Sequence, residues 1–91
     1  MIVYIAGGIT GVEDYKCRFD EAEKMLTDRG YIVMNPTVLP EGMPRGSYIP
    51  ICLAMLEQAD AIYLLEGWEE SEGAKIERQY AEYRGKWIYH E

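Results

Sequence analysis

Glu77 is the residue of this sequence whose surroundings most clearly suggest chemistry. On the helix predicted from Ser71 to Arg84, the positions three and four residues from Glu77 carry no Lys or Arg; they hold Gly73, Ala74, Tyr80 and Ala81. If this helix packs Ala74 and Ala81 against a sheet, the Glu77 carboxyl group points the same way. Burying an unpaired carboxylate is costly or raises its pKa, and such carboxylates cluster at functional sites. Glu77 is therefore a candidate catalytic residue.

The other charged residues of the predicted helix can pair with one another. Lys75 lies three residues after Glu72, and Arg78 lies four residues before Glu82. Opposite charges at these spacings meet on a helix surface, so we expect a solvated face. A small rotation of the helix would place Glu77 at the edge of that face, and from the residues alone this plainer interpretation stays open.

The beginning of the same helix is suited to bind an anion. Ser71 occupies the position of an N-cap, and Glu72 lies in the first turn, where an acidic side chain suits the helix dipole. Free backbone N–H groups in this turn, those of Gly73 and Ala74, can bind a phosphate. Ser71 can equally serve as a plain cap.

Further candidate ligand-binding residues lie where the predicted strands end or in the loop that follows. The turn after the first strand offers backbone N–H groups, although a glycine-rich turn alone is a weak signal; its residues are Gly7, Gly8, Ile9 and Thr10. Trp68 can stack on a base or pack in an interface. Asn35 can bind a ligand or only shape the Asn-Pro turn. Arg45 can close on a phosphate or stay solvated.

The composition limits the class of protein. With 91 residues, of which 48% are hydrophobic, the chain can build one small domain. Its net charge of −7 repels phosphate backbones, so no nucleic-acid partner is expected. No segment reads as a signal peptide or is apolar enough to span a bilayer, which favours a cytoplasmic protein without a membrane partner. So small a domain has reason to self-associate, and we expect a homodimer or a higher homo-oligomer.

The two cysteines form neither a metal motif nor a disulfide framework. Cys17 and Cys52 fall in separate predicted helices, without CxxC or Cys/His spacing. We expect no metal and no organic cofactor. Cys52 shares an apolar stripe with Met55 and Leu56, so core packing is its predicted role.

Hydrophobic periodicity predicts alternating strands and helices. The predicted strands are Ile2–Ala6, Tyr31–Met34, Ala61–Leu65 and Trp87–His90, and the predicted helices are Val12–Arg29, Pro50–Gln58 and Ser71–Arg84. The segment Pro36–Ser47 holds three prolines and two glycines. That composition is typical of a binding loop or lid.

The order of these elements predicts a single-domain flavodoxin-like α/β fold. Repeated βαβ units with right-handed crossovers build a parallel sheet, here of about four strands, with helices on both faces. Ligands on such sheets bind beyond the carboxyl ends of the strands. Candidate residues from Gly7 to Thr10, Asn35 and Trp68 all follow a predicted strand end.

Three segments resemble the nucleoside 2-deoxyribosyltransferase-like family. "YIAGGITG" at Tyr4–Gly11 is similar to the family's opening YIAGPITG, and "GYIVMNP" is similar to its second strand. "ADAIYLLEGWEESEGAKIE", which ends at Glu77, is similar to CDAIxLLPGWExSxGAxxE. The resemblance runs nearly end to end and is strongest to a small phage and bacterial branch, the DUF4406-like proteins. It implies one domain of this type over residues 1–91.

The resemblance implies a reaction at an N-glycosidic bond. The glutamate that closes the third motif is the family's nucleophile and falls on Glu77. It would attack C1′ of a 2′-deoxyribosyl group through a covalent intermediate, and water or an acceptor base would then release the sugar. Tyr4 matches a tyrosine that positions the nucleophile, or is a core aromatic. Ser71 matches the branch that hydrolyses deoxynucleoside 5′-monophosphates, so these are favoured over nucleosides as the small-molecule substrate.

Three departures from the family pattern bear on another interpretation. Cys52 stands where active members tend to carry an aspartate that handles the base and its proton, and Gly8 replaces a proline, which loosens the loop without removing chemistry. The sequence also lacks, after its fourth predicted strand, the C-terminal segment that larger transferases lend to a neighbouring subunit's site. A protein that keeps the pocket without turnover would be a nucleotide-binding sensor, sequestering protein or regulator. A purely structural or interaction module is a third reading, and it requires Glu77 to be exposed to solvent.

Overall fold

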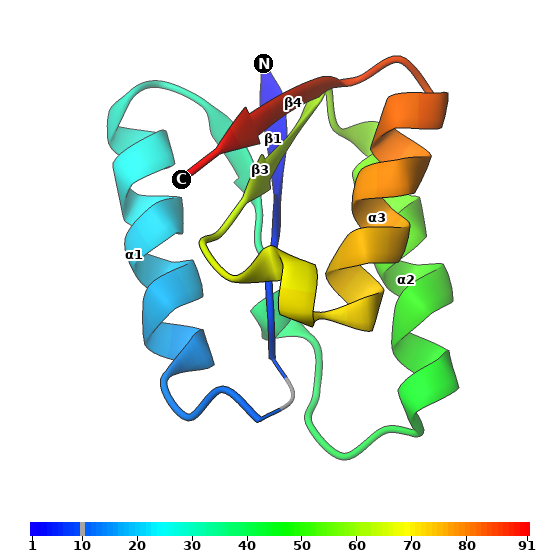
Figure 1. The fold of residues 1–91 in the computed structure, drawn as a ribbon. Helices are drawn as coiled ribbons and strands as arrows, with labels where there is room; N and C mark the ends of the chain where they lie inside the picture. The colour runs from blue at the N-terminus through cyan, green and yellow to red at the C-terminus, as the bar shows by residue number, and fades with distance from the viewer. Residues whose placement is uncertain (10) are drawn as a thin grey trace.

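The computed structural model describes residues 1–9 and 11–91 and confirms the predicted α/β class (Figure 1). The elements are β1 (Ile2–Ala6), α1 (Tyr15–Asp28), β2 (Ile32–Met34), η1 (Pro36–Val38), α2 (Arg45–Gln58), β3 (Ala61–Leu64), η2 (Trp68–Glu70), α3 (Glu72–Tyr83) and β4 (Trp87–His90). The two η elements are single turns of 3-10 helix.

The four strands form one parallel sheet in the order β2-β1-β3-β4. This is the flavodoxin-like order, in which the chain moves outward from β1 in one direction and then in the other. Tyr4 in the middle of β1 is opposite Met34 of β2 and Ile62 of β3. β1 and β3 are short apolar runs because both of their faces are covered.

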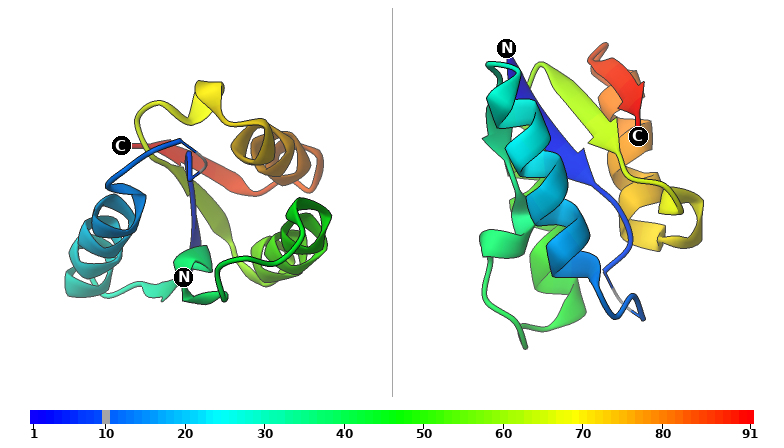
Figure 2. Two further views of the ribbon diagram at one scale, coloured as in Figure 1. Left: turned by 90° about the horizontal axis from the view of Figure 1, so that it is seen from below. Right: turned by 90° about the vertical axis from the view of Figure 1, so that its left-hand side faces the viewer.

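Helices cover both faces of the sheet, with α1 on one side and α2 and α3 together on the other (Figure 2). Because side chains alternate along a strand, Val3 and Ile5 pack with Phe19 of α1, whereas Tyr4 packs on the α2 and α3 side. The apolar stripe of α1 and the small residues of α3 thus bury opposite faces of the same central strand.

The ends of α1 and α3 agree with the sequence prediction, whereas the start of α1 does not. Gly30 and Gly85 follow α1 and α3 with φ of 94° and 71°, a left-handed conformation that glycine adopts without strain. α1 was expected to begin at Val12 but begins at Tyr15. The N–H of Val12 donates instead to the carbonyl oxygen of Ile9 at 3.2 Å, so a separate turn precedes the helix.

The predicted start of α2 near Pro50 is wrong, and the predicted loop Pro36–Ser47 is too long. The helix begins at Arg45 with Pro44 as its N-cap residue, and Pro50 lies inside it. The N–H of Ser47 donates to the carbonyl oxygen of Pro44 at 2.9 Å, which sets the first turn. A proline here forfeits only one hydrogen bond near the helix beginning, and the other contacts of α2 outweigh that loss.

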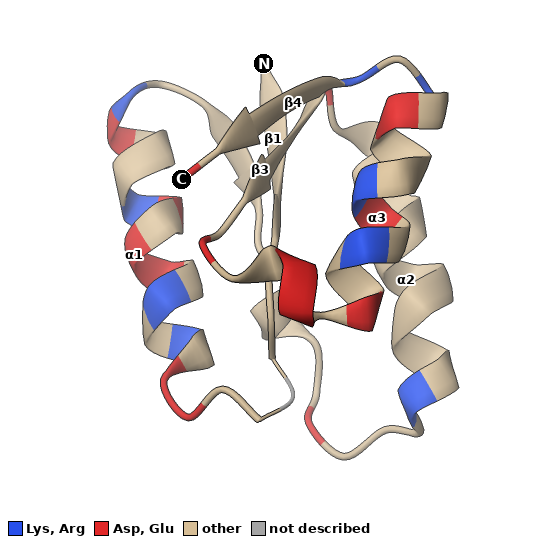
Figure 3. Cartoon of the chain, in the orientation of Figure 1, with Lys and Arg blue, Asp and Glu red and all other residues tan. Residues whose placement is uncertain are grey.

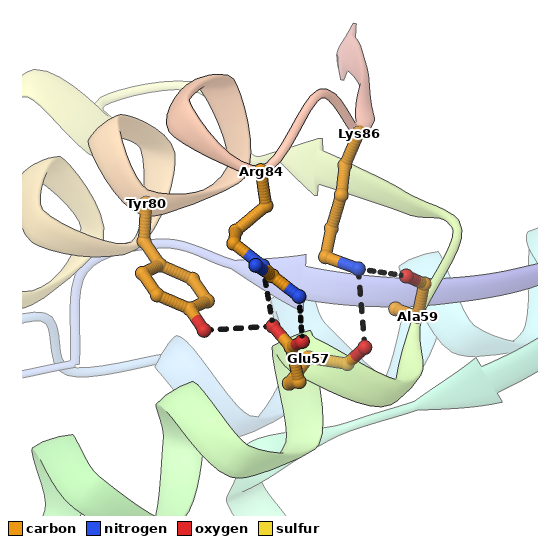
Figure 4. Close-up of polar contacts among 5 residues, drawn as sticks. All are labelled: Glu57, Ala59, Tyr80, Arg84 and Lys86. Carbon is orange, nitrogen blue, oxygen red and sulfur yellow. Dashed lines mark hydrogen bonds and ion pairs between the residues drawn. The ribbon is translucent and has the colours of Figure 1, made fainter.

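A polar network ties the carboxyl-terminal ends of α2 and α3 together (Figure 4). The hydroxyl of Tyr80 donates to the Glu57 carboxylate at 2.7 Å, and the Arg84 guanidinium donates to both oxygens of that carboxylate. These hydrogen bonds hold the pKa of Glu57 below its ordinary value. Lys86 Nζ donates to the carbonyl oxygens of Glu57 and Ala59 at 3.1 and 2.7 Å. The lysine therefore satisfies carbonyl groups that the end of α2 leaves free.

Charged residues of both signs are interspersed along α1 and α3, whereas residues 46–56 of α2 carry no charge (Figure 3).

None of the described helices combines the length and the apolar composition that crossing a membrane requires.

Lys86→Met is expected to lower the free energy of unfolding by about 1–2 kcal/mol, because it removes the cation from two carbonyl oxygens at the end of α2. Urea unfolding would measure the change. Lys75→Met is the matched control, since its pair with Glu72 is exposed and such pairs contribute below about 1 kcal/mol. Equal losses in the two variants would contradict the capping role of Lys86.

Candidate active site

A cavity of about 870 Å³ lies at the carboxyl ends of the central strands. Its walls come from the turn after β1, from η1 and the loop that follows, and from the beginnings of the three helices. The first residue of each helix lines it, namely Tyr15, Arg45 and Glu72. The volume suits a small molecule. The position between β1 and β3 is where doubly wound sheets bind their ligands.

Glu77 and Tyr4 meet in this cavity. Glu77 is only 6% exposed, so the prediction that it faces the buried side of its helix is confirmed. The fully buried hydroxyl of Tyr4 donates to Glu77 Oε2 at 2.7 Å. The exposure of Glu77 that an interaction module would require is therefore absent.

Burial dominates the electrostatics of this pair. It raises the pKa of Glu77 to about 7, although hydrogen bonds from Tyr4 and Cys52 act in the opposite direction. Burial and the adjacent carboxylate raise the pKa of Tyr4 well above its ordinary value, so its hydroxyl remains a donor. The arrangement is a carboxylate that stays partly protonated near neutral pH and is held by a neutral donor.

Cys52 belongs to the core and also to the cavity. It is 7% exposed and packs in the core cluster with Leu56, as its apolar stripe predicts. It also lines the cavity, and burial is the main cause that raises the pKa of its thiol. The apolar stripe had indicated the packing role, and the resemblance had placed Cys52 at a site position; the two roles meet because α2 lies against α3.

Ser71 is the N-cap of α3, as predicted. Its Oγ accepts a hydrogen bond from the N–H of Ala74 at 3.2 Å. Ser71 and Gly73 both line the cavity. The predicted pair of Glu72 with Lys75 is present at 3.0 Å. The N–H of Ala74, which was expected to be free for a phosphate, is therefore already capped by Ser71, whereas Gly73 lies in the cavity wall.

The turn after β1 also reaches the cavity, through Gly7, Gly8 and Ile9. Thr10, the fourth residue predicted there, lies outside the described residues. A Cβ added to Gly7 would stand 3.0 Å from Cβ and Cδ1 of Leu65, a tight contact that would require Leu65 to shift by a few tenths of an ångström. Gly7 therefore lets this turn approach the residue that follows β3 closely.

Asn35 is not among the residues that line the cavity. It is 5% exposed, and its amide nitrogen donates to Asp20 and Glu23 at 3.1 and 2.8 Å. Its amide oxygen accepts from the N–H of Thr37 at 2.9 Å, which caps η1. The side chain is engaged in tying α1 to the Asn-Pro turn, which is the structural alternative stated for it.

Trp68 also lies away from the cavity walls. It packs partly buried against the core on the α2 and α3 side. Its ring lies 6.2 Å from that of His90, and the Arg78 guanidinium stands 5.9 Å from its centroid. The structure thus gives Trp68 a packing environment and does not bring it to the ligand site.

Arg45 lines the cavity, although from the first turn of α2 instead of from a loop. It is exposed, and it is the one Lys or Arg among the described residues of the cavity wall. A guanidinium at this place is available to an anionic ligand.

Sequence reasoning missed three residues that line the part of the cavity between α1 and α2, namely Tyr15, Glu41 and Tyr48. The Tyr15 hydroxyl donates to Glu41 Oε1 at 2.8 Å, which joins α1 to the loop after η1. The Tyr48 hydroxyl donates to the carbonyl oxygen of Pro40 at 2.6 Å and so fastens the same loop to α2. The one signal in the sequence was the proline-rich loop that holds Glu41, because neither tyrosine has a distinctive spacing. In the part of the chain that the structure describes, no three His, Cys, Asp or Glu side chains group as metal ligands do.

Comparison with known proteins gives one family match. The family described as "Domain of unknown function (DUF4406)" matches residues 1–90. A search of curated proteins finds no match to the chain.

Glu77→Gln is expected to stabilise the protein above neutral pH. The folded-state pKa of about 7 exceeds the ordinary value of 4.5, so between these values the folded protein holds a proton that the unfolded chain releases. The contribution of Glu77 to stability is therefore fully present below about pH 4.5, falls as the pH rises to about 7 and is constant above it. The loss is on the order of 3 kcal/mol.

Urea unfolding of both proteins between pH 4.5 and 8 would check this expectation. The advantage of Glu77→Gln should be largest at pH 8 and small at pH 4.5. Glu69→Gln, an exposed residue of η2, controls for the loss of one negative charge. Stability curves of wild type and Glu77→Gln that stay parallel over this range would show that burial does not perturb Glu77.

Proposed function

Because the chain belongs to the DUF4406 family and carries a buried carboxylate in its cavity, we propose that it cleaves or transfers at the N-glycosidic bond of 2′-deoxynucleotides. The family match supports the resemblance to the DUF4406-like branch, and the wider relationship to nucleoside 2-deoxyribosyltransferases is part of this proposal. The observation that carries it is the 2.7 Å hydrogen bond from Tyr4 to Glu77 within the cavity.

The proposed reaction is a double displacement. Tyr4 holds Oε2 of Glu77, and Oε1 attacks C1′ of the deoxyribosyl group. The C1′–N bond breaks, and the base leaves with the bonding electrons and takes up a proton. Water or an acceptor base then attacks C1′ of the glycosyl ester, loses a proton and frees the carboxylate. Two inversions give net retention at C1′.

Burial of Glu77 favours this chemistry for an electrostatic reason. The oxocarbenium-like transition state carries positive charge beside the carboxylate. Among the described residues, the side chains that act on the pKa of that carboxylate are Tyr4 and Cys52, and both are neutral. Charge developing on the sugar therefore meets an electrostatic environment that already favours it.

Three features support a 5′-monophosphate as the preferred substrate. The cavity contains the first turn of α3, whose N–H groups and dipole favour an anion. Ser71 caps that turn as a neutral residue, where an aspartate would repel phosphate. Arg45 adds a guanidinium from the beginning of α2.

A second candidate function is nucleotide binding without turnover. The observation that favours it is the buried thiol of Cys52 beside Glu77, in a place where the resemblance implies a carboxylic acid. Burial raises the pKa of this thiol above its ordinary value of 9.0, which makes it a weak acid for a departing base. The same cavity would then serve a sensor, a sequestering protein or a regulator.

Release of free base decides between these functions. Deoxynucleosides and their 5′-monophosphates would be incubated with the protein, with and without an acceptor base, and separated by chromatography. We expect release from monophosphates, and a rate at least 1000-fold lower in Glu77→Ala, on the order of magnitude that removal of a nucleophile costs. Glu69→Ala serves as the exposed control. Nucleotide binding by the wild type without any release would favour the second function.

The same assay at several pH values has an expected form. The ionised carboxylate is the nucleophile, so kcat/KM should rise with pH to a plateau, with an inflection near the Glu77 pKa of about 7. A profile without an inflection in this region would count against attack by Glu77.

Substitutions at Ser71 and Arg45 test the phosphate preference. Ser71→Asp keeps an N-cap, and we expect it to lower kcat/KM for monophosphates about 100-fold more than for nucleosides, because the aspartate repels phosphate. Arg45→Met should lower kcat/KM for monophosphates about tenfold and leave kcat/KM for nucleosides unchanged. Equal effects on both substrate types would place the phosphate elsewhere.

A further inference from the structure

The part of the cavity between α1 and α2 carries polar groups that the proposed reaction does not use. Tyr15 and Glu41 line it, together with Tyr48 at the beginning of α2. Its remaining walls are mainly apolar; they include Phe19, Leu39, Pro40 and Met43. Apolar walls with a few fixed polar groups are typical of sites that bind small molecules.

The hydroxyl groups that line this part of the cavity already donate their protons to other groups of the protein. Tyr15 donates to Glu41 Oε1 at 2.8 Å, and Tyr48 donates to the carbonyl oxygen of Pro40 at 2.6 Å. Thr37, which also lines the cavity, donates its hydroxyl proton to Asn35 at 2.7 Å. The Tyr48 oxygen also accepts from the N–H of Met43 at 3.1 Å, so the Glu41 carboxylate is the strongest acceptor that this part offers a ligand.

The placement of the sugar decides which end of a nucleotide reaches Glu41. With C1′ at Glu77 and the 5′ end at Ser71 and the first turn of α3, the base extends away from α3 toward α1 and residues 39–44. This step rests on the proposed function.

We propose that Glu41, oriented by Tyr15, selects nucleotides whose base carries an exocyclic amino group over those with an oxo group in its place. An amino group donates to the carboxylate, and a hydrogen bond to a charged acceptor is stronger than one between neutral groups. An oxo group would set two acceptor oxygens against each other. Glu41 is exposed in the free protein, so the preference arises when the bound base displaces water from the carboxylate. A base with an oxo group would then leave the carboxylate unpaired.

Matched pairs of nucleotides test this proposal without any turnover. Binding of 2′-deoxyadenosine and 2′-deoxyinosine 5′-monophosphates, and of the 2′-deoxycytidine and 2′-deoxyuridine monophosphates, would be measured by calorimetry on Glu77→Gln. Within each pair, the second nucleotide carries an oxo group where the first carries an amino group. The neighbouring ring nitrogen is protonated in the oxo member and unprotonated in the amino member. The amino-bearing member is expected to bind at least tenfold more tightly in the pair whose ring size fits the cavity.

Three variants locate the source of the preference. In Glu41→Gln the amide can both donate and accept, so the amino-to-oxo ratio should fall to within about threefold of one. Tyr15→Phe should reduce the ratio less, because the carboxylate remains while its orientation is lost. Arg45→Met is the control, which should weaken both members of a pair and leave their ratio unchanged.

The outcomes separate this inference from the proposed function. Equal binding within both pairs, tighter binding of the oxo members, an unchanged ratio in Glu41→Gln or no binding of any of the four nucleotides would each overturn the role of Glu41. Base release that depends on Glu77 would still stand after the first three of these results. Conversely, the wild type could prefer the amino members and lose that preference in Glu41→Gln, yet release no base. That result would contradict the glycosidic reaction and retain Glu41 as the determinant of nucleotide recognition.

Discussion

Parallel pairing of β1 with both β2 and β3 is the constraint from which the rest of the architecture follows. Each crossover helix must run antiparallel to the strands, so all three helices begin at the carboxyl edge of the sheet. α1 leaves on one face and α2 on the other, so the connections diverge beside the end of β1 and leave a cavity between them. The partial positive charge of three helix beginnings is directed at this cavity. The location of the site is thus a property of strand order more than of any single residue.

Within that cavity the ionised and protonated forms of the Glu77 carboxyl group are close in free energy near neutral pH. Burial in the α2 and α3 side of the core disfavours the ionised form of Glu77, and the hydrogen bond from Tyr4 offsets only part of that cost, which leaves the pKa near 7. A buried group that is neither fully neutral nor fully paired responds strongly to a charge brought by a ligand. The proposed reaction, in which positive charge develops beside Glu77, would use the same balance that makes Glu77 destabilising above neutral pH.

In so small a domain, some side chains both stabilise the fold and line the cavity, whereas others only stabilise the fold. Ser71 caps α3 and lines the cavity, and Cys52 fills the core and lines the same cavity. Asn35 is different, because the acids of α1 and the turn of η1 engage its amide fully. Trp68 is likewise engaged with His90 and Arg78. A polar or aromatic residue at a strand end is therefore not sufficient to mark a ligand contact.

The sequence by itself determined the class of fold and the strands to within one residue, and it marked Glu77 as an acid among small residues, whose burial the structure then decided. These properties depend on local patterns: short apolar runs, glycines at positive φ after helices, and small residues at helical spacing around one acid. It did not determine where α2 begins, since a proline signal near Pro50 competed with an unmarked first turn at Arg45. Nor did it reveal the hydrogen bond between Tyr15 and Glu41, which joins residues 26 positions apart in the chain. Only the tertiary structure decided such contacts, because they depend on the distance between α1 and a loop that share no local pattern, and packing against the sheet sets that distance.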